Sequence, residues 1–234
     1  MMKLPPIYRR RIVEASDVVT SNCQFQRNQF MAMGILTEPL CDIVPTDFYY
    51  TPRVQKRLAV VALGRISTDK NSQSIVDIFK ALAGTGIERV YIGSANLWGF
   101  QVDEDAAIEH AIEDNCDQFH KNVPHPRVGR VLSEMAYGIF DSYHDCSSTS
   151  NQQALMSGIQ CFYGQHGLWR ERLGIHNHET PDDFVESLKR HSDDFKAKPS
   201  APTRQRIEKW AKARWSPEVF LCQWRAILQK CEMK

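Results

Sequence analysis

The segment Leu58–Leu63 places the strongest constraint on the fold, because it is apolar without interruption and has the length of one β-strand. Such a strand is typically buried on both faces, as in the parallel sheet of an α/β protein. A polar loop, Gly64–Asn71, and then a helix follow it, and the next strand is expected at Val90–Gly93. The helix has its apolar side chains at helical spacing, at Ile75, Ile78, Phe79 and Leu82. This order predicts a β-α-β unit with two parallel strands.

Further elements extend the α/β pattern on both sides of this unit. Short strands are expected at Asp17–Ser21, Ile139–Phe140 and Ile159–Tyr163. Helices are expected at Gln24–Met33, Val102–Gln118, Val128–Met135, Thr180–His191, Arg204–Ala213 and Pro217–Lys230. We therefore expect an α/β fold with a parallel sheet, flanking helices and closing C-terminal helices.

Two polar connectors suggest boundaries within the chain. The first, Thr46–Lys56, is rich in aromatic residues and stiffened by prolines, which is typical of a hinge, and the second, Lys196–Thr203, is a proline-rich linker. We expect three parts, at residues 1–50, 51–195 and 196–234.

Charge and composition exclude several classes of protein. Lys and Arg number 29 and Asp and Glu 28, a formal net charge of +1, which argues against affinity that comes mainly from neutralising nucleic-acid phosphates. No window approaches the roughly 18 uninterrupted apolar residues of a membrane helix, and the N-terminus lacks the apolar stretch of a signal peptide. We expect a soluble, cytoplasmic protein without membrane insertion. The 7 cysteines contain no C-x-x-C pair, so we expect neither a disulfide framework nor a zinc site, and His176–Glu179 is interpreted as a solvated loop.

The loop after the first strand contains the first candidate site, in the pattern G-R-x-S-x-x-K-N over Gly64–Asn71. Loops at the carboxyl ends of parallel strands are where open α/β sheets bind ligands. Arg65 and Lys70 lie five residues apart there, and two such cations can converge on a diphosphate, Arg bidentately and Lys as a point charge. The alternative is a loop whose Arg and Lys face solvent.

A second polar run, Ser147–Gln153, lies directly before an apolar helical stretch. Ser, Thr and Asn residues are favoured at this position because they cap a helix N-terminus. The run should therefore present backbone N–H groups and hydroxyls, which together suit an anion or a sugar hydroxyl. The alternative is a polar helix cap without a ligand.

The order of these elements resembles the donor-binding C-terminal half of glycosyltransferases with two Rossmann domains, the GT-B type, especially the retaining nucleotide-sugar enzymes. Leu63–Asn71 matches their pyrophosphate loop, and Gln153–Gly158 matches their Glu-Ala-Met-Ala-x-Gly helix start. Ala15–Asn22 looks like the last strand of their first domain, and Ile43–Pro45 looks like the crossing between domains. Residues 132–164 also look similar to phage DNA α-glucosyltransferases, which decorate hydroxymethylated cytosine.

This resemblance implies a fold and an activity. Residues 51–195 would be a Rossmann-like nucleotide-sugar-binding domain, residues 1–50 the remnant of the first domain with its hinge, and residues 196–234 a linker and helices that pack back. The implied reaction moves a sugar from a nucleoside-diphosphate sugar, with a UDP-sugar favoured, to an acceptor hydroxyl, in the host cytoplasm if the protein is viral.

Individual residues acquire roles from the same resemblance. Arg65 and Lys70 would be catalytic, by stabilising the charge that builds on the departing diphosphate. The donor-binding positions would be Gly64, Ser67, Gly93, Ser148, Thr149, Asn151 and Gln153. No metal or other cofactor is required by this scheme, because the cations substitute for one. Asp103–Asp105 is interpreted as the acidic start of a helix rather than a D-x-D metal motif.

Two departures from the family lead to an alternative function. Gln153 stands where the family has a glutamate, and we expect the family's acceptor-binding domain, of roughly 150 or more residues before the matched part, to be essentially absent. The alternative is a non-catalytic nucleotide-sugar-binding or regulatory module. In either case we expect a partner, which would be a second glycosyltransferase domain, another chain or a second copy in a homo-oligomer.

A third hypothesis is action on nucleic acid, with DNA as the acceptor. It rests on the basic run Arg9–Arg11 and on the basic, Trp-bearing stretch Arg204–Trp215. The alternative for both stretches is a solvated helix face, with the tryptophans packed in a core or an interface.

Overall fold

The computed structural model describes residues 15–22, 24–95, 102–143, 148–164, 177–178 and 180–232. The chain divides into two compact units, unit 1 with residues up to Ile43 and from Ala213 onward, and unit 2 with Val44–Lys212. The division falls earlier than the expected boundary at residues 50/51 because Phe48 and Tyr50 are buried in unit 2. The basic run Arg9–Arg11 lies outside the described residues.

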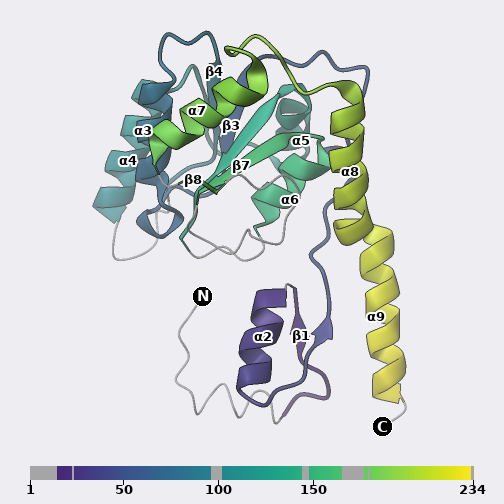
Figure 1. The fold of residues 1–234 in the computed structure, drawn as a ribbon. Coiled ribbons are helices and arrows are strands. Elements are labelled where there is room, and N and C mark those ends of the chain that lie inside the picture. Colours follow the sequence, from purple (N-terminus) through teal and green to yellow (C-terminus); the bar gives the residue numbers. More distant parts are fainter. Residues whose placement is uncertain are drawn as a thin grey trace. The chain divides into compact units, whose positions relative to one another are not determined.

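Unit 2 is built on a sheet whose 6 described strands are all parallel (Figure 1). The strands are β3 (Ala59–Leu63), β4 (Glu88–Ile92), β5 (Gln118–His120), β6 (Tyr137–Phe140), β7 (Gln160–Gly164) and β8 (Asn177–His178). Their order across the sheet is β5-β4-β3-β6-β7-β8. With β3 counted as the first strand, this is the 3-2-1-4-5-6 order of doubly wound dinucleotide-binding folds. The expected α/β parallel sheet is confirmed.

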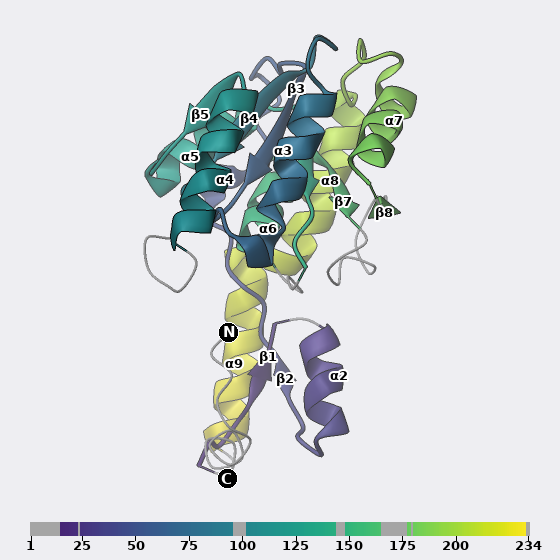
Figure 2. The same cartoon turned by 90° about the vertical axis from the view of Figure 1, so that its left-hand side faces the viewer.

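Helices cover both faces of this sheet (Figure 2). The helices α3 (Ser72–Ala81), α4 (Val102–Asn115) and α7 (Pro181–Ser192) pack together on one face. The other face is covered by α5 (His125–Glu134), α6 (Thr149–Met156), the short 3-10 helix η1 (Thr46–Phe48) and the first part of α8 (Ala201–Trp215). The helix of the expected β-α-β unit is α3. The apolar positions expected from the sequence are all buried, Ile75, Ile78 and Phe79 in α3 and Leu82 directly after it.

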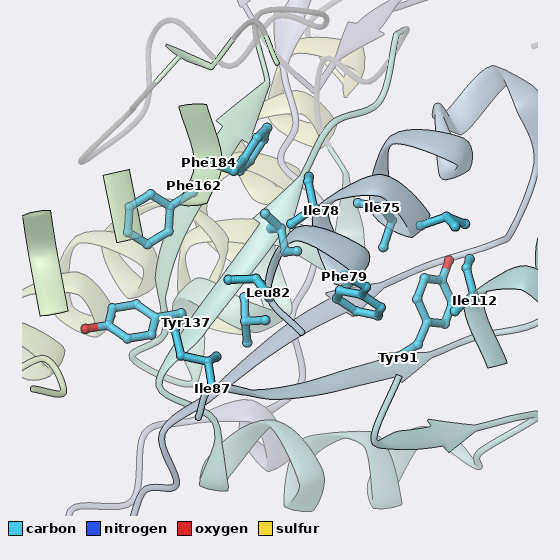
Figure 3. Close-up of a cluster of buried hydrophobic side chains, with 14 of the residues drawn as sticks. Ile75, Ile78, Phe79, Leu82, Ile87, Tyr91, Ile112, Tyr137, Phe162 and Phe184 are labelled. Atoms are coloured by element: carbon cyan, nitrogen blue, oxygen red, sulfur yellow. The ribbon is translucent and has the colours of Figure 1, made fainter. Parts of the chain in front are cut away.

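The main core lies between the sheet and α3, α4 and α7 (Figure 3). Phe79 of α3 is fully buried there, and Phe184 of α7 joins the same cluster at 1% exposure. On the sheet, Tyr137 and Phe162 contact each other with ring centroids 5.7 Å apart. Burial of this apolar surface is the main force that holds the helices on the sheet.

Several element boundaries differ from the expectations, each for a local reason. The helix expected at 102–118 ends at Asn115, because β5 begins at Gln118 and Phe119 stacks on Tyr91 with centroids 5.9 Å apart. The helix expected from Val128 begins at His125, because a proline is tolerated in the first turn of a helix. The helix expected from Thr180 is confirmed, and a capping box between Thr180 and Asp183 closes its N-terminus.

Unit 1 is small and contains two parallel two-residue strands, β1 (Thr20–Ser21) and β2 (Glu38–Pro39), with α2 (Gln24–Ala32) between them in the chain. The helix α9 (Pro217–Glu232) belongs to the same unit. It is joined to the segment around β2 by a hydrogen bond from the Cys41 N–H to Gln223 Oε1 (2.8 Å) and by an ion pair between Lys230 and Glu38 (2.6 Å). Across the described residues, the helices fall short of the length and apolar character that a membrane span requires.

A buried cation holds α8 in unit 2. Arg204 is only 2% exposed, and its guanidinium donates to the carbonyl oxygens of Pro199 (3.0 Å) and Met135 (3.1 Å), with a longer contact to Gly158 (3.5 Å). Arg204 therefore is not part of a solvated basic face, although Arg206, Lys209 and Arg214 on the same helix are exposed. The buried guanidinium satisfies carbonyl groups at the amino ends of β6 and β7.

A second buried cation, Lys56, makes stability depend on pH. Its ammonium group donates to the carbonyl oxygen of Ser133, and burial together with the charge of Arg204 lowers the pKa of Lys56 from 10.5 to about 8. Between these two values the unfolded chain holds the proton and the folded chain has lost it, so a rise in pH favours the folded state. We expect the wild type to gain about 1–2 kcal/mol in unfolding free energy over Lys56→Met between pH 7 and 9.5.

Chemical denaturation of both proteins across this range measures that gain. Because the difference between the two proteins is compared, other groups that titrate above pH 9 cancel. A constant difference, or one that falls with pH, would contradict the assignment of the effect to Lys56.

Candidate functional site

The sheet has a switch point between β3 and β6. These strands are neighbours, yet the chain continues from β3 toward β4 on one side and from β6 toward β7 on the other. The helices that follow them, α3 and α6, lie on opposite faces of the sheet. In open α/β sheets, ligands bind in the crevice outside the carboxyl ends of the strands at such a point.

A small pocket of about 80 Å³ opens at the switch point. Its polar lining comes from the loop after β3, the end of β6 and the start of α6, with Gly64, Arg65, Lys70, Asp141, Ser142, Ser148 and Ser150. The structure thus brings the two predicted cations, Arg65 and Lys70, to one cavity. Ser142 is 5% exposed, and its hydroxyl is buried without a hydrogen-bond partner among the described residues.

A larger cleft of about 500 Å³ adjoins this pocket and shares Gly64, Arg65 and Ser150 with it. Its lining comes from the ends of three strands, β3, β4 and β5, and from α5 and α6, and includes Gly93, Ser94, Asn122, His125, Thr149 and Gln153. A volume of about 300–1,000 Å³ is typical of small-molecule sites. The predicted residues Gly93, Thr149 and Gln153 therefore lie in one cleft.

The ends of β3 and β4 approach each other backbone to backbone. A Cβ atom at Gly93 would lie 1.9 Å from the carbonyl oxygen of Gly64, and both residues have positive φ, +155° and +145°. The Tyr91 hydroxyl donates to the same oxygen at 3.3 Å. Burial raises the pKa of Tyr91, so its phenol stays protonated and keeps this donor. Gly64 and Gly93 thus fix where the loop leaves the sheet.

The loop after β3 is tied to the end of β6 by Asp141. It forms a short 3-10 helix, η2 (Thr68–Lys70), and Asn71 adopts the left-handed conformation (φ 52°) before α3. The Asp141 carboxylate accepts from Asn71 Nδ2 at 2.8 Å and from Ser74 Oγ at 2.6 Å. Sequence reasoning missed Asp141, although it is the acidic residue directly after an expected strand.

Two predicted donor-binding residues line neither cavity. Asn151 is 0% exposed and donates from Nδ2 to the Tyr163 hydroxyl at 2.8 Å, which joins α6 to β7. Ser67 is 4% exposed, and its N–H donates to Ser72 Oγ at 3.0 Å, at the start of α3. Ser148 is the N-cap of α6 and lines the small pocket, and its side chain makes no capping hydrogen bond. Ser147, the first residue of the predicted run, lies outside the described residues.

His125 is a further residue of the cleft that sequence reasoning missed. It begins α5, and its Nε2 lies 2.8 Å from Nε2 of Gln153. Its ring also meets Phe48 edge-on, with centroids 5.0 Å apart at 67°. Gln153 itself is 5% exposed. The only signal in the sequence was a histidine between two prolines, directly ahead of an expected helix.

Within the described ranges, no group of three or more His, Cys, Asp or Glu residues could hold a metal ion. His176 and Glu179, which the sequence placed in a solvated loop, lie outside these ranges. Asp103–Asp105 is the acidic first turn of α4, as expected, and the buried Asp105 accepts from the N–H of Thr68 at 3.2 Å.

Comparisons with known proteins identify the fold. Models of known protein families give no match to the sequence, and neither do curated proteins. Among solved structures, Anabaena HepE in complex with UDP and glucose matches with a TM-score of 0.73 at 12% identity, over 97% of this chain and 68% of that one. Sucrose-phosphate synthase from Thermosynechococcus elongatus matches with a TM-score of 0.74 at 13% identity, over 96% of this chain and 60% of that one.

An isolated domain also matches. The C-terminal domain of the group 1 glycosyltransferase LpcC from Francisella tularensis has a TM-score of 0.55 at 13% identity, over 73% of this chain and 96% of the domain. The chain thus spans about two thirds of the longer structures and nearly all of the isolated domain. The expected fold, that of the C-terminal half of GT-B glycosyltransferases, is confirmed.

Proposed function

We propose that this chain is the donor-binding half of a glycosyltransferase, which moves a sugar from a nucleoside-diphosphate sugar to an acceptor hydroxyl. The observation that carries the proposal is the pair of adjoining cavities at the switch point of the sheet, one with Arg65 and Lys70 and one of about 500 Å³. A nucleotide sugar has matching chemistry, because it joins an anionic diphosphate to neutral groups rich in hydroxyls.

Arg65 and Lys70 would act on the leaving group. When the bond between sugar and diphosphate breaks, negative charge builds on the diphosphate, and preorganised cations lower the free energy of that state. The N-terminus of α6, with Ser148 and Thr149, adds backbone N–H groups and hydroxyls at the edge of the same cavities. Gln153 would bind a hydroxyl of the donor.

The finer features of the reaction belong to the same proposal. UDP is the favoured nucleotide, supported by the UDP bound in the HepE structure. The two cations make a metal ion unnecessary for charge neutralisation. The acceptor would be bound by a further domain, contributed by the same polypeptide, by another chain or by a second copy, since the matched HepE and sucrose-phosphate synthase chains extend beyond the part that this chain covers.

A non-catalytic nucleotide-sugar-binding module is the second candidate. It is favoured by Gln153, because an amide cannot supply the negative charge of the family's glutamate. Both candidates bind the nucleotide sugar. Only the enzyme transfers the sugar to an acceptor or slowly hydrolyses the nucleotide sugar to free sugar.

A thermal-shift screen tests the shared part of both candidates. UDP, GDP, ADP, TDP and their sugar conjugates are added to the purified chain, and a ligand at 100 times its Kd should stabilise the folded state by about 2.7 kcal/mol. For a chain of this size we expect a rise in Tm of about 5 °C or more for one nucleotide.

The controls for this screen are two arginine variants. Arg65→Ala should reduce the shift, and Arg130→Ala, an exposed residue of α5 outside both cavities, should keep it in full. A screen without any shift would reject a donor site. When a donor is found, acceptors are tried next, beginning with simple hydroxyl compounds and with DNA that contains hydroxymethylcytosine.

A further inference from the structure

The side chains of Gln153 and His125 contact each other, and the amide of Gln153 can face the imidazole with either its nitrogen or its oxygen. The two atoms in contact are both nitrogens, Gln153 Nε2 and His125 Nε2, 2.8 Å apart. An amide nitrogen can only donate, so the imidazole nitrogen must accept. In this orientation the contact requires the tautomer of His125 that has its proton on Nδ1, because the donor and acceptor roles follow the tautomer.

The other ends of both side chains have no hydrogen-bond partner in the described part of the chain. Gln153 Oε1 makes no hydrogen bond there, and the remaining contact of the His125 ring is the edge-on one with Phe48. No other group of the described residues thus sets which way the amide points. In the tautomer with the proton on Nδ1, His125 sets it, since turning the amide by 180° would then place two acceptors against each other.

We infer that His125 is a positioning residue that holds the amide oxygen of Gln153 ready to accept a hydrogen bond from a hydroxyl of the donor. The inference rests on the proposed function for the identity of the ligand. Both residues line the cleft of about 500 Å³, from opposite elements, α5 and α6. Gln153 is 5% exposed, so its amide has little freedom to find other partners.

This arrangement lets an amide serve as an acceptor toward a ligand. A carboxylate has two acceptor oxygens and needs no orientation, whereas an amide offers an acceptor at one end and a donor at the other. By engaging the donor end, His125 makes Gln153 an acceptor toward the ligand. The pair would therefore accept a hydrogen bond from the ligand as a single carboxylate does, although it carries no negative charge.

The first test needs no ligand. In protein labelled with 15N at histidine, long-range 15N–1H spectra at pH 8 distinguish the two neutral tautomers. We expect His125 with its proton on Nδ1, and we expect Gln153→Glu to move the proton to Nε2, because a carboxylate requires a donor. A proton on Nε2 in the wild type would overturn the inference, even if the chain bound no nucleotide sugar.

The second test measures affinity for UDP-glucose by calorimetry. His125→Phe keeps a ring beside Phe48 but removes the acceptor, and the Kd should rise about 5- to 10-fold, the loss of one oriented hydrogen bond. Adding Gln153→Glu to this variant should restore the Kd to within about 3-fold of the wild type, since a carboxylate accepts in either orientation. His110→Phe, on a side chain that is 77% exposed, is the matched control.

Two results in that series would overturn the inference. One is an unchanged Kd in His125→Phe, which would leave His125 a packing role only. The other is a further loss of affinity when Gln153→Glu is added, which would mean that the ligand accepts from Gln153 rather than donating to it. If the wild type itself fails to bind any nucleotide sugar, the proposed function is rejected, and the tautomer measurement still decides the pairing.

Discussion

Replacing Arg65 or Lys70 with alanine should lower the rate of sugar transfer by about 10²–10³-fold, the usual cost of removing one preorganised donor that acts on developing charge. Both residues line the small pocket at the switch point. Because the charge on the diphosphate grows as the bond breaks, the loss should fall more on kcat than on KM. Initial-rate kinetics with the nucleotide sugar identified by thermal shift measure both constants.

Each of these variants has a matched control in the same unit. Arg130→Ala and Lys80→Ala remove exposed cations of the same type that line neither cavity, and their kinetics should equal those of the wild type. Tm should stay within a few degrees in all four variants, since Arg65 is exposed and Lys70 half-buried. If Arg65→Ala and Lys70→Ala retained full kcat, the catalytic role of the pocket would be refuted.

Arg204→Ala should lower the free energy of unfolding by about 3–5 kcal/mol. The side chain is 2% exposed and donates to three carbonyl oxygens, those of Pro199, Met135 and Gly158. Its removal leaves buried acceptors unsatisfied at about 1–3 kcal/mol each and opens a cavity where the side chain was. Urea denaturation followed by circular dichroism measures the loss.

Two further variants separate the hydrogen bonds from other effects. Arg206→Ala removes an exposed arginine from the same helix and should change stability by less than about 0.5 kcal/mol. Arg204→Met fills most of the space without donors, so it should recover the packing part of the loss and not the hydrogen-bond part. Equal stability of Arg204→Ala and Arg206→Ala would show that the guanidinium contributes nothing to holding α8.

The sheet and the position of the site could be predicted from the sequence because both depend on local signals. The apolar run Leu58–Leu63 and the helical spacing in α3 are properties of neighbouring residues, and the structure confirms both. The rule that ligands bind at carboxyl strand ends predicts a site at Arg65 and Lys70, and the resemblance to GT-B enzymes adds Thr149 and Gln153 to it. The structure brings them to two adjoining cavities.

The features that were missed depend on contacts between distant segments. Asn151 looked like a ligand because a polar residue at a helix start is usually exposed, yet here it is buried against Tyr163 of β7. His125 and Asp141 became site residues only through partners 28 and 70 positions away in the chain. Arg204 looked like part of a basic surface, and no sequence pattern shows that carbonyl groups of two strand ends converge on it. Pairings of this kind follow from topology rather than from periodicity.

The link from Asp141 to Asn71 and Ser74 also bears on how quickly a ligand can bind. It joins the loop after β3 to the end of β6, two of the three segments that line the small pocket. The loop is therefore ordered when the protein folds, and a ligand that enters does not have to restrict it further, so less conformational entropy is lost on association. Binding should then proceed in one concentration-dependent phase, without the slow second phase that marks the closing of a flexible loop.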